Sequence, residues 1–132
     1  MYIGDKDLKT TVYESDFLRE FKEYGREDNF SFEGLQILFD YLEMWEQDTG
    51  EEIELDVISL CGDYCELTYL EFIREYRLNI ENYYNIEDCT QTWEEALEED
   101  KDKVIEILTN YINENTSLVG FTDKGTVIYQ VW

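Results

Sequence analysis

Apolar side chains recur at helical spacing in two segments near the start of the chain. Ser15 is a candidate N-cap for a first helix that ends at Gly25, and Ser31 is one for a second helix running to about residue 48. The apolar positions are Phe17, Leu18, Phe21 and Tyr24 in the first segment, and Leu35, Leu38, Phe39, Leu42 and Trp45 in the second. Spacings of three and four residues place each set on one side of a helix, so both helices are predicted to pack on the core.

A strand-like pattern follows these helices. In residues 53–57 an apolar residue alternates with an acidic one, and a mostly apolar run then continues to Cys61. This pattern predicts a strand over residues 53–61 whose second half is buried on both faces. Residues 7–14 are weakly strand-like, because their Thr, Val and Tyr side chains favour extended backbone.

Capping boxes mark further helices in the second half of the chain. Thr68 and Glu71 form the first box and open a short helix, and Thr92 and Glu95 open another that runs to about residue 100. A helix over residues 102–113 follows, either as a separate element or as a continuation of its predecessor. Residues 78–90, rich in Asn and Tyr, are predicted to form a loop.

The chain is predicted to end in a hairpin. Residues 117–121 and 126–131 are rich in strand formers, and the turn between them contains Gly125, which can adopt a positive φ. The order of elements shows no regular strand–helix–strand alternation. We therefore predict an α+β fold in a single domain, residues 1–132: a small antiparallel sheet of three or four strands, including the C-terminal hairpin, packed on one face against several helices.

Negative charge is concentrated in two windows of the sequence. The 132 residues include 33 acidic and 10 basic ones, for a formal net charge of −23. Residues 27–73 contain fourteen acidic residues and residues 78–100 contain eight, and neither window contains Lys or Arg. Ordinary soluble domains mix both signs on their surfaces. This segregation of charge favours a negatively charged surface that has a function. The alternative interpretation is that the negative charge only increases the solubility of the protein.

Composition also excludes several classes of protein. Hydrophobic residues make up 43% of the chain, enough for a real core. Binding to nucleic acid or to anionic membranes needs Lys and Arg, so neither is expected. The sequence has no apolar run of membrane-spanning length and no signal-peptide pattern at Met1. The odd number of cysteines, three, indicates reduced thiols, and we expect a cytoplasmic protein.

Candidate catalytic and metal-binding patterns are weak. The chain has no histidine, and its carboxylates are so frequent that any one pair carries no specific signal for acid–base catalysis. The calcium-loop pattern is not present. Cys61, Cys65 and Cys89 could supply three thiolates to zinc, but without a C-x-x-C pair a structural role is favoured. We expect no enzymatic activity, no catalytic residue, no metal site and no cofactor.

The acidic surface itself is the candidate functional feature. Carboxylates four residues apart on a helix are about 6 Å apart, and duplex DNA carries about one negative charge per 1.7 Å of its axis. The predicted partner-binding residues are Glu43, Glu46, Asp48, Glu51, Glu52, Glu54, Glu94, Glu95, Glu98, Glu99, Asp100 and Asp102. Glu95, Glu98, Glu99 and Asp102 are predicted to share one helical face.

These residues predict a basic DNA-binding protein as the partner, with no direct contact to nucleic acid or membrane. The alternative is a regulator that binds its partner through aromatic residues. Tyr83, Tyr84 and Trp93, which lie beside acidic segments, are candidates for such anchors.

Three segments resemble small acidic proteins of phages and mobile elements: LFDYLE at residues 38–43, DTGEEIELDVI at 48–58 and LCGDYCE at 60–66. The following helix and the closing hairpin are similar in order, and relative to that pattern residues 78–110 look like an acidic insertion. This class includes anti-CRISPR and anti-restriction inhibitors, several of which mimic DNA.

The resemblance implies a phage-encoded inhibitor of a host DNA-targeting defence nuclease, acting in the cytoplasm of the bacterial cell. The leading expectation is an anti-CRISPR protein that blocks binding of target DNA and its PAM to a type II single-protein effector. An anti-restriction DNA mimic and a non-mimetic protein-binding regulator are the alternatives. The protein is expected to be a monomer or a small homo-oligomer.

Overall fold

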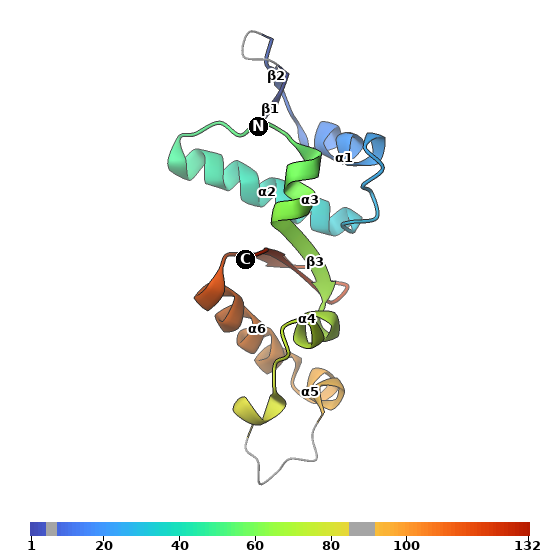
Figure 1. The fold of residues 1–132 in the computed structure, drawn as a ribbon, viewed down its shortest axis with the longest axis vertical. Helices are drawn as coiled ribbons and strands as arrows, with labels where there is room; N and C mark the ends of the chain where they lie inside the picture. Colours follow the sequence, from blue (N-terminus) through green and yellow to red (C-terminus); the bar gives the residue numbers. More distant parts are fainter. Residues whose placement is uncertain (5–7, 85–91) are drawn as a thin grey trace.

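The computed structural model describes residues 1–4, 8–84 and 92–132 (Figure 1). The helices are α1 (Glu14–Glu23), α2 (Phe32–Thr49), α3 (Val57–Asp63), α4 (Tyr69–Glu75), the short 3-10 helix η1 (Ile80–Asn82), α5 (Trp93–Glu99) and α6 (Lys101–Asn115). The strands are β1 (Tyr2–Ile3), β2 (Thr10–Thr11), β3 (Tyr64–Thr68), β4 (Leu118–Phe121) and β5 (Thr126–Gln130). β1 and β2 pair with each other, and the other three form an antiparallel sheet in the order β3-β5-β4. The predicted α+β class and the C-terminal hairpin are confirmed.

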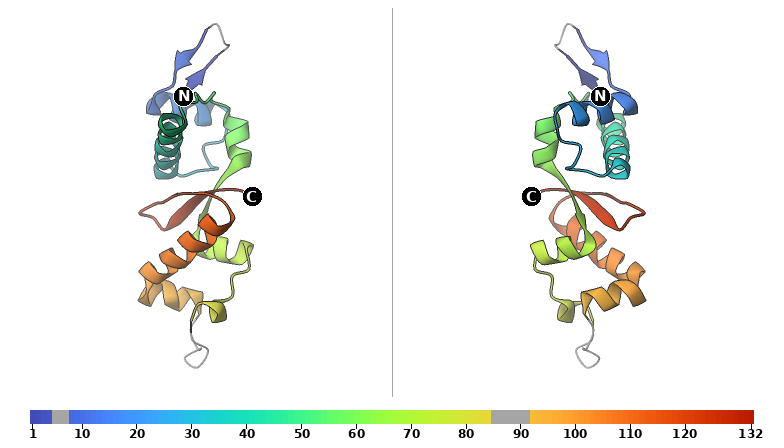
Figure 2. Two further views of the ribbon diagram at one scale, coloured as in Figure 1. Left: turned by 90° about the vertical axis from the view of Figure 1, so that its left-hand side faces the viewer. Right: turned by 90° about the vertical axis from the view of Figure 1, so that its right-hand side faces the viewer.

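The three-stranded sheet lies across the middle of an elongated molecule, between two groups of helices (Figures 1 and 2). Helices α1, α2 and α3 lie on one side of it, and α4, α5 and α6 lie on the other. The prediction that the helices cover a single face was wrong. In β5, the central strand, Val127, Ile128 and Tyr129 are all buried. An uninterrupted apolar run of this kind requires cover on both faces of the sheet.

The sheet divides the hydrophobic core in two, because successive side chains of a strand point to opposite faces. Ile128 joins the first core, to which α1, α2 and α3 contribute Phe17, Phe21, Leu38 and Leu60. Val127 and Tyr129 join the second core, to which α4, α5 and α6 contribute Phe72, Ala96, Val104 and Leu108. Residues 92–110 thus supply part of the second core. That residues 78–110 are an insertion relative to other proteins stays a prediction.

The predicted strand over residues 53–61 was wrong. Only Glu54 makes a bridge, to Tyr2, and helix α3 begins at Val57. Asp56 caps this helix, since its Oδ1 accepts a hydrogen bond from the Ser59 N–H at 3.1 Å. The Asp56 side chain thus accepts a hydrogen bond from a backbone N–H that, in a strand, would pair with a neighbouring strand. The strand that joins the sheet is β3, which starts directly after the helix.

Helices α5 and α6 are two elements rather than one continuous helix. They are separated at Asp100, whose φ of −146° and ψ of 57° are not helical. The predicted common face of Glu95, Glu98, Glu99 and Asp102 is therefore wrong, because Asp102 belongs to α6 and the other three to α5. Of the weak strand predicted over residues 7–14, the described residues form a strand at Thr10–Thr11. Of the predicted loop over residues 78–90, residues 85–90 lie outside the described residues, and the 3-10 helix η1 falls within the described part, residues 78–84.

A half-buried carboxylate on β3 joins three elements. Glu66 accepts hydrogen bonds from the Ser31 N–H at 2.8 Å, from the Ser31 hydroxyl at 2.8 Å and from the Thr126 hydroxyl at 2.6 Å. The Ser31 hydroxyl in turn accepts from the Gly34 N–H at 2.9 Å, so it also caps α2. A Cβ at Gly34 would overlap the Glu66 carboxylate. Glu66 thus ties the start of α2 to β3 and β5, and a larger residue at position 34 would have to displace its carboxylate.

Candidate protein-binding surface

The first set of predicted site residues lies on and just after α5. We call Glu94, Glu95, Glu98, Glu99, Asp100 and Asp102 the α5 acidic group. All six residues are exposed. Glu94 lies 3.5 Å from an Arg74 guanidinium nitrogen, and the other five have no ion pair within the described part of the chain. The α5 acidic group therefore presents five exposed carboxylates that have no ion pair among the described residues, all within residues 95–102.

The second set surrounds the C-terminal end of α2. We call Glu43, Glu46, Asp48, Glu51, Glu52 and Glu54 the α2 acidic group. Several of these carboxylates have partners within the chain. The N-terminal ammonium of Met1 donates to Glu46 and, at 3.4 Å, to Glu43, while the Lys9 ammonium lies 3.0 Å from Glu52. Asp48, Glu51 and Glu54 are exposed and, among the described residues, have no ion pair.

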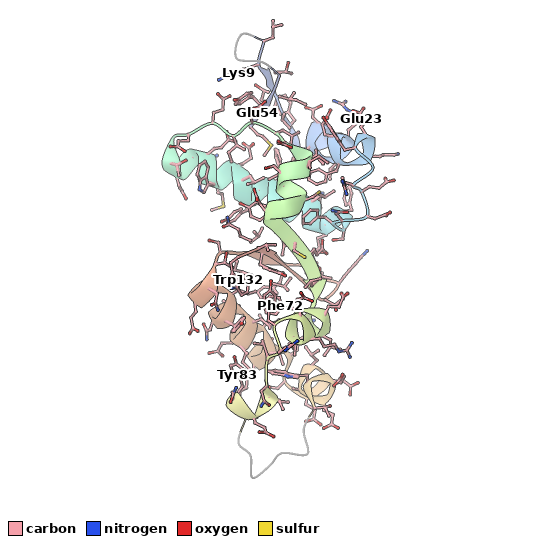
Figure 3. The ribbon with its side chains drawn as sticks, viewed as in Figure 1. Lys9, Glu23, Glu54, Phe72, Tyr83 and Trp132 are labelled. Carbon is pink, nitrogen blue, oxygen red and sulfur yellow. The ribbon has the colours of Figure 1, made fainter. Side chains whose placement is uncertain are left out.

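The structure does not bring the two acidic groups together. The α2 acidic group lies in the part of the molecule that contains α1 and β1, where Figure 3 labels Glu54. The α5 acidic group lies at the opposite end of the long axis, beyond the three-stranded sheet (Figure 1). A partner can engage one group by itself, or both only if its own surface extends along the whole molecule.

Both acidic helices carry acidic residues at their C-terminal ends. The C-terminal end of a helix carries partial negative charge and is normally paired with Lys or Arg. The last turns of α2 and α5 contain no basic residue, and they contain Glu46, Asp48, Glu98 and Glu99 instead. Helices α1 and α4, in contrast, have Lys22 and Arg74 in their last turns. Helices α3 and α6 also lack a basic residue in their last turns, so this feature is not specific to the acidic groups. At α5 the unpaired Glu98 and Glu99 oppose helix stability, whereas Glu46 of α2 is paired with the N-terminal ammonium.

We predict that screening stabilises the isolated protein. Raising NaCl from about 10 mM to about 150 mM shortens the Debye length from roughly 30 Å to roughly 8 Å and weakens repulsion among exposed carboxylates. The melting temperature should rise over this range in a thermal unfolding experiment. A melting temperature that falls on adding NaCl contradicts clustered, unpaired charge on this fold.

Glu46 differs from the other predicted site residues because it is largely enclosed. Its side chain is 12% exposed, and its Oε2 also accepts the Ile53 N–H at 3.0 Å. Burial by itself raises the pKa of this carboxyl, but the hydrogen bonds from the N-terminal ammonium and from Ile53 outweigh burial and leave the pKa lowered. Glu46 therefore holds the residue 50–54 segment against α2 and is a structural residue rather than a contact for a partner.

This role predicts a pH dependence for Glu46→Gln. A lowered pKa in the folded state means that the ionised Glu46 stabilises the fold above its ordinary pKa of about 4.3, and that this contribution is lost as the pH falls further. The difference in unfolding free energy between wild type and E46Q should be constant from about pH 5 to pH 7 and shrink below about pH 4. Urea titrations across this range test it, and a difference that grows at acidic pH contradicts it.

The cysteines show no geometry for metal binding or nucleophilic chemistry. Cys61 lies in α3 and Cys65 in β3, both half-buried and free, while Cys89 falls outside the described residues. Burial raises the pKa of both thiols, which keeps them protonated near neutral pH. Among the described residues, no three His, Cys, Asp or Glu side chains are grouped as a metal site would require. No helix in the described ranges is both long and apolar enough to cross a membrane.

The aromatic residues suggested as partner anchors pack mainly within the chain. Trp93 lies between Tyr83 and Tyr84, with ring centroids 5.9 and 6.3 Å away, and its Nε1 donates to the Leu78 carbonyl at 3.0 Å. Both tyrosines are half-buried. Figure 3 shows Tyr83 at the lower end of the molecule, near η1. These rings pack η1 against α5, the helix that carries most of the α5 acidic group.

A different aromatic group lines a surface hollow that the sequence did not reveal. Tyr41 and Trp45 of α2, Tyr64 of β3 and Asp63 of α3 surround a volume of about 420 Å³, which we call the aromatic hollow. Trp45 was predicted to be a core residue, but its side chain is 39% exposed. The available signal was the spacing of Tyr41 and Trp45, four residues apart on one side of α2. The position of Tyr64 beside these two residues was not predictable, because the sequence predicts a strand over residues 53–61 where the structure has helix α3.

Comparison with known proteins assigns no function, since no family model, curated protein or solved structure matches the chain.

Proposed function

We propose that this protein is a phage-encoded inhibitor that occupies the basic DNA-binding groove of a host DNA-targeting nuclease. The α5 acidic group is the surface that enters the groove. A type II single-protein CRISPR effector is the leading target, and a restriction enzyme is the second. The inhibitor acts in the bacterial cytoplasm by excluding DNA, without a catalytic residue or a cofactor of its own.

The observation that carries this proposal is the state of the α5 acidic group. Five of its carboxylates are exposed and, within the described ranges, none has an ion pair. Two of them, Glu98 and Glu99, lie where the helix dipole disfavours negative charge. A protein selected for stability or solubility alone would place Lys within residues 94–100, and that stretch contains none; Lys101 follows it directly.

The physical basis of inhibition is the one that drives DNA binding itself. A nuclease groove lined with Arg and Lys binds phosphates, and much of the free energy comes from the release of condensed counterions. Glu95 and Glu99 are four residues apart on α5 and about 6 Å apart along the axis. A row of carboxylates at such intervals is attracted electrostatically to the groove and can pair with the arginines that read the PAM.

A non-mimetic regulator that binds through apolar and aromatic side chains is the second candidate. The observation in its favour is the exposure of Phe32 and Met44, at 67% and 62%. The two candidates differ in their salt dependence, because burial of apolar surface is weakened far less by salt than pairing of exposed charges.

Purified nucleases test the proposal directly. The protein is added to a guide-loaded type II effector and, separately, to a type I restriction enzyme, before the target duplex is supplied. We expect cleavage to fall with increasing inhibitor at low salt, and less so when the duplex is bound first. Poly-glutamate at equal total charge is the control for non-specific polyanion effects. Full cleavage by both enzymes at saturating protein overturns these two targets.

A further inference from the structure

We propose that the aromatic hollow receives an arginine side chain of the basic partner, an inference that rests on the proposed function and adds an anchor to it. Its walls combine three aromatic rings with a carboxylate. The hollow lies in the half of the molecule formed by α2 and α3, away from the α5 acidic group. It therefore supplies a contact that is independent of that group.

The backbone places the three rings around one space. Tyr41 and Trp45 are one helical turn apart on α2, so their side chains leave the same side of the helix. Tyr64, the first residue of β3, lies across from them, with its ring centroid 6.1 Å from that of Tyr41 and the planes at 70°. Ile53 and Leu60 close the apolar base of the hollow. The rings thus present π faces and edges to a space large enough for a side chain.

A carboxylate completes the arrangement. Asp63 ends α3 and is one of the residues that line the hollow, and its backbone carbonyl accepts the Val131 N–H at 2.8 Å. Burial first, and then the nearby Tyr41 and Asp63, raise the pKa of Tyr64. No Lys or Arg lines the hollow.

These groups fit a guanidinium better than other ligands. A cation is attracted to the faces of Trp and Tyr rings, and a planar guanidinium can stack on them while donating two hydrogen bonds to one carboxylate. An uncharged apolar ligand would gain no attraction from the exposed Asp63 carboxylate. The net charge of −23 adds a long-range attraction for a cationic segment.

A second hollow on the same half of the molecule provides an internal control. It has a volume of about 390 Å³ and is lined by Phe30, Phe32 and Leu35. Arg19, Lys22 and Glu27 also line it, so its lining residues carry a net positive charge, unlike those of the aromatic hollow. Exposed Phe32 is therefore an aromatic residue beside a hollow of similar size that should not bind arginine.

The test compares two labelled peptides that differ only in charge, (Arg-Gly)4 and (citrulline-Gly)4, by fluorescence anisotropy at fixed salt. We expect wild type to prefer the arginine peptide. In Trp45→Leu, which keeps an apolar side chain, and in Asp63→Asn, affinity for the arginine peptide should fall roughly 2- to 30-fold, the range of a cation–π contact. Phe32→Leu should leave affinity unchanged. Equal loss in F32L, or no loss in W45L and D63N with unchanged melting temperatures, overturns the hollow as an arginine site.

The experiments distinguish an error in the proposed arginine site from an error in the proposed function. If W45L inhibits the nuclease as well as wild type does and binds both peptides as wild type does, the hollow is overturned and the inhibitor proposal stands. If neither nuclease binds but W45L and D63N lose the preference for arginine, the hollow is supported and the nuclease target is wrong.

Discussion

Replacing Glu95, Glu98 and Glu99 of α5 with lysine should weaken binding to the target nuclease by at least about a hundredfold. Coupling energies of close interfacial charge pairs are roughly 1.5 kcal/mol or more, and reversal turns each attraction into repulsion. The three side chains are exposed and make no contact on which the fold depends. The change should therefore leave the melting temperature unchanged or raise it, since repulsion within α5 decreases. Calorimetric titration of the purified nuclease with the variant measures the loss.

A matched variant separates the position of the charges from their number. Glu23, Glu75 and Glu114 are exposed and belong to neither acidic group, so changing all three to lysine alters the net charge by the same amount. Figure 3 shows Glu23 on α1, far from α5 along the long axis. We expect this variant to keep most of the affinity. Equal losses in the two triple variants would mean that only total charge matters, and the α5 acidic group would then have no special role.

Glu66→Ala should cost about 2–4 kcal/mol of unfolding free energy, the second large effect. The substitution removes the acceptor for one backbone N–H and two hydroxyls, and hydrogen bonds to a charged group contribute about 1.5–3 kcal/mol where they are sheltered. The donors belong to the start of α2 and to β5, so the contact between the first core and the sheet is weakened. Urea unfolding gives the free energy.

Three further substitutions test the reason for that loss. Glu66→Gln keeps the side-chain volume and one acceptor, so it should cost less than Glu66→Ala. Glu75→Ala removes a carboxylate that makes no hydrogen bond among the described residues, and it should change stability by less than about 0.5 kcal/mol. Gly34→Ala should destabilise the protein even though alanine favours helices by about 1 kcal/mol over glycine, because its Cβ would displace the Glu66 carboxylate. A stabilising G34A contradicts the role given to Glu66.

Local signals in the sequence were sufficient for most helices. Ser31, Thr68 and Thr92 cap α2, α4 and α5 as predicted, and each side chain accepts from a backbone N–H three residues on. Gly50 ends α2 with a φ of 72°. Caps and apolar periodicity act within a few residues, so one sequence reveals them. The C-terminal hairpin was predictable for the same reason.

Features that depend on distant contacts were not predictable. The alternation in residues 53–57 is typical of a strand, yet the chain uses Asp56 as a cap and the strand starts at Tyr64. Glu66 looked like one more carboxylate of an acidic window, and its role arises only because Ser31 and Thr126 fold against it. The apolar run of β5 is visible in the sequence, but the elements that cover its two faces are distant from it along the chain.

The candidate site was predictable in composition but not in arrangement. Eleven of the twelve predicted acidic residues lie in the two charge windows and Asp102 follows the second window, and the fold separates the twelve into two groups with the sheet between them (Figure 1). Charge alone cannot distinguish Glu46, which pairs with the N-terminus, from Glu98, which is exposed. The sequence predicts a helix that runs to about residue 100, but it does not decide whether the next helix is separate, because residues on both sides of Asp100 favour helix.

Competition between this protein and duplex DNA for the purified, guide-loaded type II effector tests the proposed function most directly. The measurement is the dissociation constant of the inhibitor at several salt concentrations, with and without a PAM-containing duplex. We expect affinity to fall steeply and linearly with the logarithm of salt, as it does for DNA, and the duplex and inhibitor to exclude each other. Binding that does not change with salt, or a stable complex of effector, duplex and inhibitor, contradicts DNA mimicry by the α5 acidic group.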